Sequence, residues 1–203
     1  MALVFSRLKH KDYAKAVRFM MVGMNVDAYH DNRLFQYAYG IYFFYSELIR
    51  SSQVIAAYEG RKLAGVLLAD MDGEEKAHNT RFNRLLIRFV KLFMRAPGEG
   101  VRTYWQANDE MFEAYQKTHT PDGELVFLAA DPEVQHKGIG TQMLAEFERR
   151  EKAKTVYLYT DDQCTYQFYE HRGFERVGEK DIVMDMGEKQ VPLKCLLYSK
   201  KLG

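Results

Sequence analysis

The sequence contains very little cysteine. Only Cys164 and Cys195 occur among 203 residues. Two isolated cysteines supply neither the clustered ligands of a zinc site nor a disulfide framework. We therefore expect no metal site, and we expect the protein to work in a reducing compartment, the cytoplasm.

A dominant charge and a long apolar run are also missing. The chain has 29 Lys and Arg against 28 Asp and Glu, a net charge of +1, so no overall field favours nucleic acid or a membrane. No apolar run approaches the roughly 20 residues that cross a bilayer. Charges at Arg7, Lys9 and Lys11 interrupt any start resembling a signal peptide. The length and the 47% hydrophobic content predict a single globular domain over residues 1–203.

The most informative segment runs from Glu124 to Thr141. A strand of buried character leads into Gln135-x-x-Gly138-x-Gly140, and a helix follows at once. The free N–H groups at a helix N-terminus bind phosphate oxygens. Glycine leaves room for the phosphate beside the backbone. The segment therefore predicts a pyrophosphate site.

Two common phosphate motifs do not fit this segment. A dinucleotide fingerprint requires a third glycine, and Met143 occupies its position. A P-loop requires Gly-x-x-x-x-Gly-Lys-Ser/Thr, which occurs nowhere in the chain. The commoner nucleotide sites are therefore excluded.

A second motif follows the next predicted strand. That strand, 155–160, is rich in β-branched and aromatic residues. After it comes Phe-Tyr-Glu-His-Arg-Gly-Phe at 168–174. The glycine turn and this segment, in this order, resemble motifs A and B of the GNAT N-acetyltransferase superfamily, whose members bind acetyl-CoA.

The resemblance implies an α/β fold in which helices flank a mixed, mostly antiparallel sheet. The pattern of apolar residues agrees with that order of elements. We expect strands at 2–8, 52–58, 62–70, 124–131, 155–160, 175–184 and 191–199, and helices at 12–24, 32–50 and 141–152. Asp31 or Asn32 is the expected N-cap of the second helix.

Residues 71–122 form an insertion between the third and fourth strands, where the family often has a short turn. A helix predicted over 77–95 has an apolar side and a basic side, and a second is predicted over 103–118. We interpret the pair as a helical hairpin packed on the core, with its basic side in solvent. The alternatives are a lid over the acceptor site, a dimer contact, or a basic surface for an acidic partner. A membrane surface is the least favoured, because the whole chain is nearly neutral.

The resemblance also implies roles for individual residues. The backbone of strand four would hold the pantetheine arm and polarise the thioester carbonyl, and the turn would bind the pyrophosphate. The expected cofactor-binding residues are Leu128, Ala129, Ala130, Gln135, His136, Lys137, Gly138, Ile139, Gly140, Thr141 and Asp162. Asp162 replaces the family's asparagine, so a contact to the pantetheine arm is lost or rearranged.

Two residues are candidates for catalysis. Tyr169 holds the position of the tyrosine that protonates the leaving thiolate in the family, with a packed aromatic ring as the alternative. Glu124 lies eleven residues before Gln135, where the histone-acetylating branch has its general base, and the alternative is a solvent-facing strand residue. His119 is a second candidate base. Cys164 is interpreted as packing, since no histidine pairs with it.

We therefore expect an acetyl-CoA-dependent N-acetyltransferase that transfers the acetyl group directly to an amine. A small-molecule acceptor is favoured over a peptide N-terminus or a protein lysine, and aromatic residues in 32–50 are expected to line its pocket. The alternatives are a non-catalytic acyl-CoA-binding module and a protein-interaction domain that uses the basic helix at 81–95. We expect no nucleic-acid or membrane partner, and a homodimer stays open.

Overall fold

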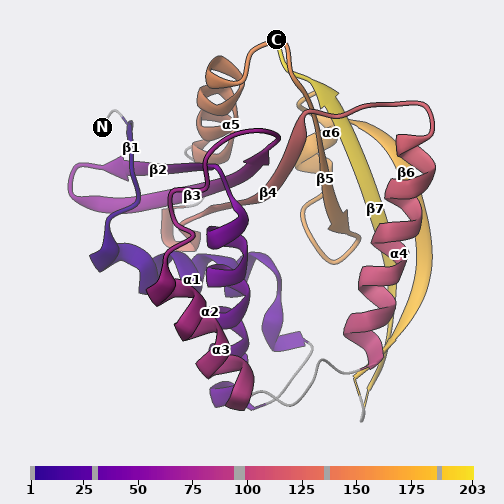
Figure 1. The fold of residues 1–203 in the computed structure, drawn as a ribbon, viewed down its shortest axis with the longest axis horizontal. Coiled ribbons are helices and arrows are strands. Elements are labelled where there is room, and N and C mark those ends of the chain that lie inside the picture. The colour runs from indigo at the N-terminus through magenta and orange to yellow at the C-terminus, as the bar shows by residue number, and fades with distance from the viewer. Residues whose placement is uncertain (1–2, 29–31, 94–98, 135–137, 187–188) are drawn as a thin grey trace.

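A seven-stranded sheet forms the frame of the protein in the computed structural model (Figure 1). The structure describes residues 3–28, 32–93, 99–134, 138–186 and 189–203. The strands are β1 (Leu3–Ser6), β2 (Gln53–Glu59), β3 (Lys62–Met71), β4 (Gly123–Ala130), β5 (Thr155–Asp161), β6 (Glu175–Asp185) and β7 (Gln190–Lys201). Their order is β1-β2-β3-β4-β5-β7-β6, and only β4 and β5 pair in parallel. The prediction of a mixed, mostly antiparallel sheet is confirmed.

The helices begin and end close to the predicted positions. They are α1 (Tyr13–Gly23), α2 (Arg33–Arg50), α3 (Arg81–Phe93), α4 (Glu99–Gln116), α5 (Ile139–Arg150) and α6 (Gln167–Glu170), with 3-10 turns η1 (His10–Asp12), η2 (Val26–Ala28) and η3 (Pro132–Val134). The Asn32 carboxamide accepts hydrogen bonds from the N–H groups of Leu34, at 2.9 Å, and Phe35, at 3.2 Å. The predicted N-cap of α2 is therefore confirmed at Asn32.

Helices cover both faces of the sheet because side chains alternate along each strand. In β7, Leu196 and Tyr198 point to the face that α5 covers, where Met143 and Phe147 of α5 join the same core. Leu197 lies between them in sequence and belongs to a separate core beneath α4. A third core joins α1 and α2 to β2, β3 and β4. It lies on the same face as α4, because Ala56 and Val66 belong to it while their strand neighbours pack against α5.

The two helices of the insertion separate. Helix α3 packs against α2, whereas α4 packs against β6 and β7, on the other half of the sheet (Figure 1). The interpretation as a helical hairpin is therefore wrong. Its predicted apolar side also faces solvent, since Phe82 is 71% and Leu85 is 66% exposed. Apolar residues are so frequent around α3 that periodicity alone did not identify the inner face, which contains Asn83 and Val90.

The sheet splits between β4 and β5. These strands pair only at Gly123 with Val156 and at Glu124 with Tyr157. Beyond that point β4 stays paired with β3, and β5 with β7, so the two halves diverge. In Figure 1 the split opens downward, with α2 and α3 on one side and α4 on the other. A register shift opposite Leu68 and Ala69 adds a bulge to β4 at the same place.

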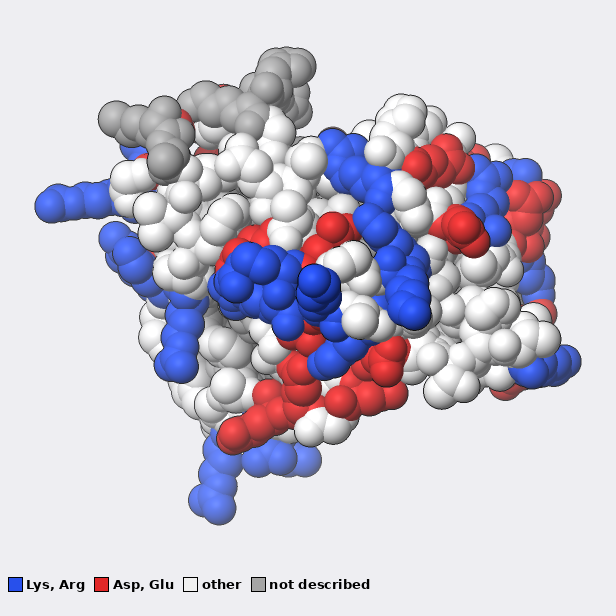
Figure 2. Space-filling view, turned by 90° about the horizontal axis from the view of Figure 1, so that it is seen from above, with Lys and Arg blue, Asp and Glu red and all other residues white. Residues whose placement is uncertain are grey.

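The surface carries charges of both signs. Figure 2 shows Lys and Arg interspersed with Asp and Glu, with broad uncharged areas between them, on the face seen from above. In the part of the chain that the structure describes, no helix is both long and apolar enough to span a membrane.

Candidate functional site

A cavity of about 1820 Å³ occupies the split in the sheet. Strands β4 and β5 line it where they separate. Helices α1 and α2 line one side and α4 lines the other, and residues of α5 and α6 line one end. Pockets for a single small ligand usually measure about 300–1,000 Å³. This cavity therefore has room for two ligands side by side.

The cavity brings together most of the predicted cofactor-binding residues. Leu128, Ala129 and Ala130 line it from β4, past the last residue that pairs with β5. Because the β5 ladder ends at Glu124, the β4 backbone beyond it has no strand partner on that side. Backbone groups in this position are available to a ligand.

The start of α5 lies at the end of the same cavity. Gly138, Ile139, Gly140 and Thr141 all line it. Gly138 is the N-cap of α5 and has a positive φ of 63°, which favours glycine. The predicted residues Gln135, His136 and Lys137 lie outside the described residues. The first turn of α5 therefore presents its N–H groups beside the cavity, as a phosphate site requires.

Gly140 has a packing role in addition to the predicted one. A Cβ at this position would lie 3.1 Å from the Phe168 ring, so glycine allows α5 to approach α6 closely. This contact joins the two motifs in space. The sequence pattern had indicated only the approach of a phosphate.

Arg172 is a cavity residue that the sequence did not single out. Its guanidinium lies 3.7 Å from the centre of the Phe168 ring, and its Nε donates a hydrogen bond of 3.1 Å to the Thr141 hydroxyl. It lines the cavity next to the α5 N-terminus. A fixed cation there adds to the positive end of the helix dipole. Arg172 occupies a variable position of the second motif, so the motif gave no signal for it.

Tyr169 faces the cavity from α6. Its ring packs edge-on against Phe168 and Phe174, at centroid distances of 5.2 and 5.6 Å. Burial raises the pKa of Tyr169, so the hydroxyl keeps its proton at neutral pH. Within the described part of the chain, no side chain hydrogen-bonds this hydroxyl. The hydroxyl is therefore free to donate to a ligand in the cavity.

Asp162 lies apart from the cavity lining. Its carboxylate accepts a 3.1 Å hydrogen bond from the Lys194 N–H, and its own N–H donates to the Lys194 carbonyl, also at 3.1 Å. These bonds tie the end of β5 to β7. Its neighbour Asp161 lines the cavity instead, where its carboxylate accepts from the N–H groups of Gln163 and Cys164. The carboxylate at 162 thus serves as an acceptor for the backbone.

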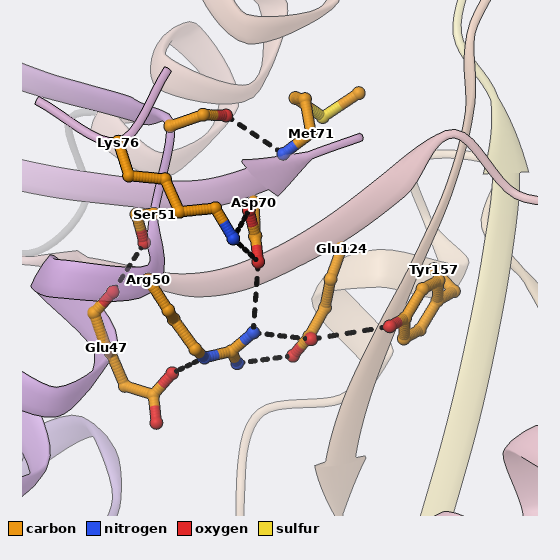
Figure 3. A network of polar contacts seen from close by, with 9 residues as sticks. Glu47, Arg50, Ser51, Asp70, Met71, Lys76, Glu124 and Tyr157 are labelled. Atoms are coloured by element: carbon orange, nitrogen blue, oxygen red, sulfur yellow. Dashed lines mark hydrogen bonds and ion pairs between the residues drawn. The ribbon is translucent and has the colours of Figure 1, made fainter. Parts of the chain in front are cut away.

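Glu124 is held by Arg50 across the base of the split (Figure 3). The two Arg50 terminal nitrogens donate to the two Glu124 oxygens at 2.8 and 2.9 Å, which is a bidentate ion pair. The Tyr157 hydroxyl donates to the same carboxylate at 3.5 Å. Glu124 is only 9% exposed. The alternative interpretation of a solvent-facing strand residue is therefore wrong.

Three carboxylates surround Arg50. Besides Glu124, it forms an ion pair with Glu47, and Asp70 lies 4.0 Å from it (Figure 3). Burial raises the pKa of Glu47, and this outweighs the opposite effect of Arg50. A second cavity, of about 210 Å³, is lined by Asp70 and Tyr157 together with Arg50 and Glu124. The Arg50–Glu124 pair therefore forms a wall shared by both cavities.

The half of the cavity between α2 and α4 is aromatic and acidic. The α2 residues that line it are Phe35, Tyr39, Tyr42, Phe43, Glu47 and Arg50, and those of α4 are Val101, Tyr104, Trp105, Asn108 and Asp109. Helix α4 supplies this wall from the insertion. The expectation that aromatic residues of 32–50 line a pocket agrees with their place in the structure.

His119 lies away from this centre. It stacks on Tyr115 at a centroid distance of 4.6 Å, beyond the end of α4, and it does not line the main cavity. Among the described residues, no group of three or more His, Cys, Asp or Glu side chains has the arrangement of a metal site.

Neither cysteine has the environment of a nucleophile. Burial, followed by the charge of Asp161, raises the pKa of both Cys164 and Cys195 to about 12. We expect both thiols of the folded protein to react with iodoacetamide near pH 8 at least about a thousandfold more slowly than free cysteine, because so little thiolate forms. Rates measured with and without urea test this. Fast alkylation of native Cys164 would contradict the assignment of a packing role.

Comparisons with known proteins agree with this architecture. Residues 101–176 match the model of the acetyltransferase (GNAT) domain family. A histone acetyltransferase HPA2-related protein from Corynebacterium glutamicum has a similar structure, with 15% identity, a TM-score of 0.62, and coverage of 100% of this chain and 98% of that one. PaiA N-acetyltransferase from Thermoplasma acidophilum, solved with coenzyme A, matches with 16% identity, a TM-score of 0.53 and 99% coverage of both chains. No curated protein matches the chain in sequence.

The protein has the GNAT fold, with a helical insertion that supplies one wall of its cavity. The match to the family model covers residues 101–176, and the solved structures, at 15% and 16% identity, show the fold.

Proposed function

We propose that the protein is an acetyl-CoA-dependent N-acetyltransferase that transfers the acetyl group directly to the amine of a small molecule. One observation carries this proposal. The Tyr169 hydroxyl, the unpaired β4 backbone and the start of α5 all border one cavity, which has room for a donor and an acceptor. PaiA N-acetyltransferase, a structural relative, was solved with coenzyme A.

The residues of the cavity fit such a donor. The N–H groups at the start of α5, with Arg172 beside them, would hold the pyrophosphate. The β4 backbone near Leu128–Ala130 would bind the pantetheine amides and polarise the carbonyl. The proposal leaves Asp162 out of this set, because its carboxylate accepts a hydrogen bond from the Lys194 N–H.

Acetyl-CoA supplies the activated acetyl group. The cavity walls hold the neutral acceptor amine against the thioester carbonyl, where a C–N bond forms as the C–S bond breaks. Tyr169 gives its proton to the departing sulfur. The amine loses a proton to a base. Proton transfer of this kind contributes about 10²–10⁴-fold to the rate, and the rest comes from positioning and polarisation.

Glu124 is our candidate base, with Arg50 as its regulator. Both Glu124 oxygens accept hydrogen bonds from Arg50, so the carboxylate takes a proton only when Arg50 moves away. Glu47 and Asp70 lie within reach of the same guanidinium and offer it other partners. An arriving ammonium group would compete with Arg50 for Glu124 directly.

The acceptor end of the cavity favours a cationic amine. Tyr39 and Tyr42 of α2 and Trp105 of α4 line this part of the cavity, and Glu47 and Asp109 add negative charge. Aromatic faces and carboxylates both attract a cation. We therefore propose a primary amine on an aromatic or aliphatic framework as the acceptor.

Two measurements on the purified chain test the proposal. Calorimetry with acetyl-CoA should show binding, and a thiol-reactive dye should report coenzyme A release with members of a panel of small cationic amines. Absence of acetyl-CoA binding would overturn the whole proposal. Binding without turnover on any amine would favour a non-catalytic acyl-CoA-binding module, for which the occupied Glu124 carboxylate is the supporting observation.

The α5 turn has its own test in Gly138→Ala. Gly138 and Gly73 both have a positive φ, of 63° and 75°, and both have open space where a Cβ would stand. Alanine should therefore cost about 1–2 kcal/mol of stability at either position. Only at 138 should the Kd for acetyl-CoA rise, by about tenfold or more, because the methyl group displaces the phosphate. Equal affinities in Gly138→Ala and Gly73→Ala would remove Gly138 from the proposed site.

A further inference from the structure

The outer face of α3 presents a stripe of large apolar side chains. Phe82, Leu85 and Leu92 are 71%, 66% and 83% exposed, and Phe89, on the same line, is 58% exposed. They recur at steps of three and four, so they form one continuous row along the helix. Rows of this kind on a soluble protein usually mark a contact surface.

A row of cations runs beside the apolar row. Arg81, Arg84, Arg88 and Lys91 recur at the same steps, and α3 contains no acidic residue. Within the described ranges, none of these four side chains forms an ion pair with another residue. A chain of net charge +1 thus gathers four positive charges on one helix of 13 residues.

The rest of α3 fixes this face outward. Asn83 and Val90 are buried, and the helix packs against α2. The Asn83 side chain donates a 2.8 Å hydrogen bond to the His78 carbonyl, and its N–H donates to the Thr80 hydroxyl at 3.1 Å. These contacts anchor the start of the helix. The apolar and basic rows therefore cannot turn inward without breaking them.

We propose that α3 docks the protein on an anionic lipid surface. The apolar row would enter the boundary between headgroups and acyl chains, while the adjacent cations bind the phosphates. Its length, about 20 Å at 1.5 Å per residue, lies flat along such a surface. Leu34 and Tyr37 of α2, the helix that α3 packs against, are also exposed, at 79% and 47%.

The charge of α3 favours lipid over a second copy of the chain. A symmetric contact through α3 would bring two rows of four cations together, and like charges across an interface oppose association. The sequence-based expectation of no membrane partner rested on the neutral charge of the whole chain. Attraction to a lipid surface depends instead on the local charge of α3, which is positive. Because Lys91 also lines the main cavity, the proposed surface borders that cavity.

Flotation of the full-length protein with vesicles tests the proposal. We expect binding to vesicles made of equal parts phosphatidylcholine and phosphatidylglycerol, weaker binding at high salt, and none to pure phosphatidylcholine. The double variant Arg84→Glu/Arg88→Glu should bind at least about tenfold more weakly, at roughly 1 kcal/mol for each cation. Leu85→Gln/Leu92→Gln should lose a similar amount, because both rows contribute.

The controls are changes of the same kind away from α3. Arg61→Glu lies in the β2–β3 turn, and Val183→Gln replaces a residue of β6 that is 54% exposed. Both should float as the unchanged protein does, and light scattering should show a monomer for every variant.

Failure to bind anionic vesicles would overturn the proposal, as would binding that both α3 variants retain. A dimer that Leu85→Gln/Leu92→Gln dissociates would assign the surface to a second copy instead. Acetyl-CoA calorimetry is independent of all these outcomes.

Discussion

Replacement of Tyr169 by phenylalanine is expected to lower kcat by about 10²–10⁴-fold. The change removes only the hydroxyl, and the ring keeps its edge-on contacts with Phe168 and Phe174. Affinity for acetyl-CoA should stay within about twofold, because a proton given to the leaving sulfur acts in the transition state and not in the ground state. Stopped-flow detection of thiol release, together with calorimetry, separates the two quantities.

Tyr166→Phe is the matched control for that experiment. Tyr166 lies three residues earlier and packs against the same core, but it does not line the cavity. Its variant should keep full activity. Weaker acetyl-CoA binding by Tyr169→Phe, with an unchanged rate constant, would remove the proton-donor role. Because burial raises the pKa of Tyr169, its ionisation should cause no loss of rate as the pH rises toward 9.

The sequence predicted the parts of the fold that local patterns specify. The strand, the glycine turn and the helix at 124–150 are contiguous, and their order alone indicates a helix N-terminus beside a strand end. The same holds for the N-cap at Asn32, which acts on N–H groups two and three residues away. These features could be predicted because each depends on interactions between residues that are close in sequence.

The parts that the sequence could not predict depend on distant contacts. Arg50 and Glu124 are 74 residues apart, and no sequence motif contains both of them. Helices α3 and α4 are close in sequence, yet they pack on different halves of the sheet. A split sheet offers two surfaces, and amphipathicity does not say which one a helix covers.

The same limit applies to the site. The motifs indicated the donor end because the α5 turn and Tyr169 are local features. The proposed acceptor end is assembled from α2 and α4, which are separated in sequence by β2, β3 and α3. Its aromatic and acidic character appears only when these helices face each other. In the proposed function, the choice of acceptor therefore depends on the cavity wall that α4 supplies.

Replacement of Arg50 by methionine is expected to destabilise the protein by about 2–4 kcal/mol and to change its response to pH. Removal of one partner from a fully buried ion pair costs about 3–5 kcal/mol, and the 36% exposure of the Arg50 side chain reduces that range. Glu124 would then have no cation beside it and would lie close to Glu47. Urea unfolding near neutral pH measures the loss.

The pH dependence shows whether unpaired carboxylates cause that loss. Burial already raises the pKa of Glu47 in the folded protein, and loss of Arg50 should raise it further above its unfolded value. The cost is therefore largest at high pH and shrinks as Glu47 takes up a proton. We expect Arg50→Met to regain stability relative to the unchanged protein between about pH 8 and pH 5.

Arg50→Met/Glu124→Met should be less destabilised than the single variant, since it leaves one buried charge fewer. Arg149→Met, which breaks the exposed pair with Glu146 on α5, should show no such effect. A pH-independent loss would assign Arg50 to packing and remove its proposed control over Glu124.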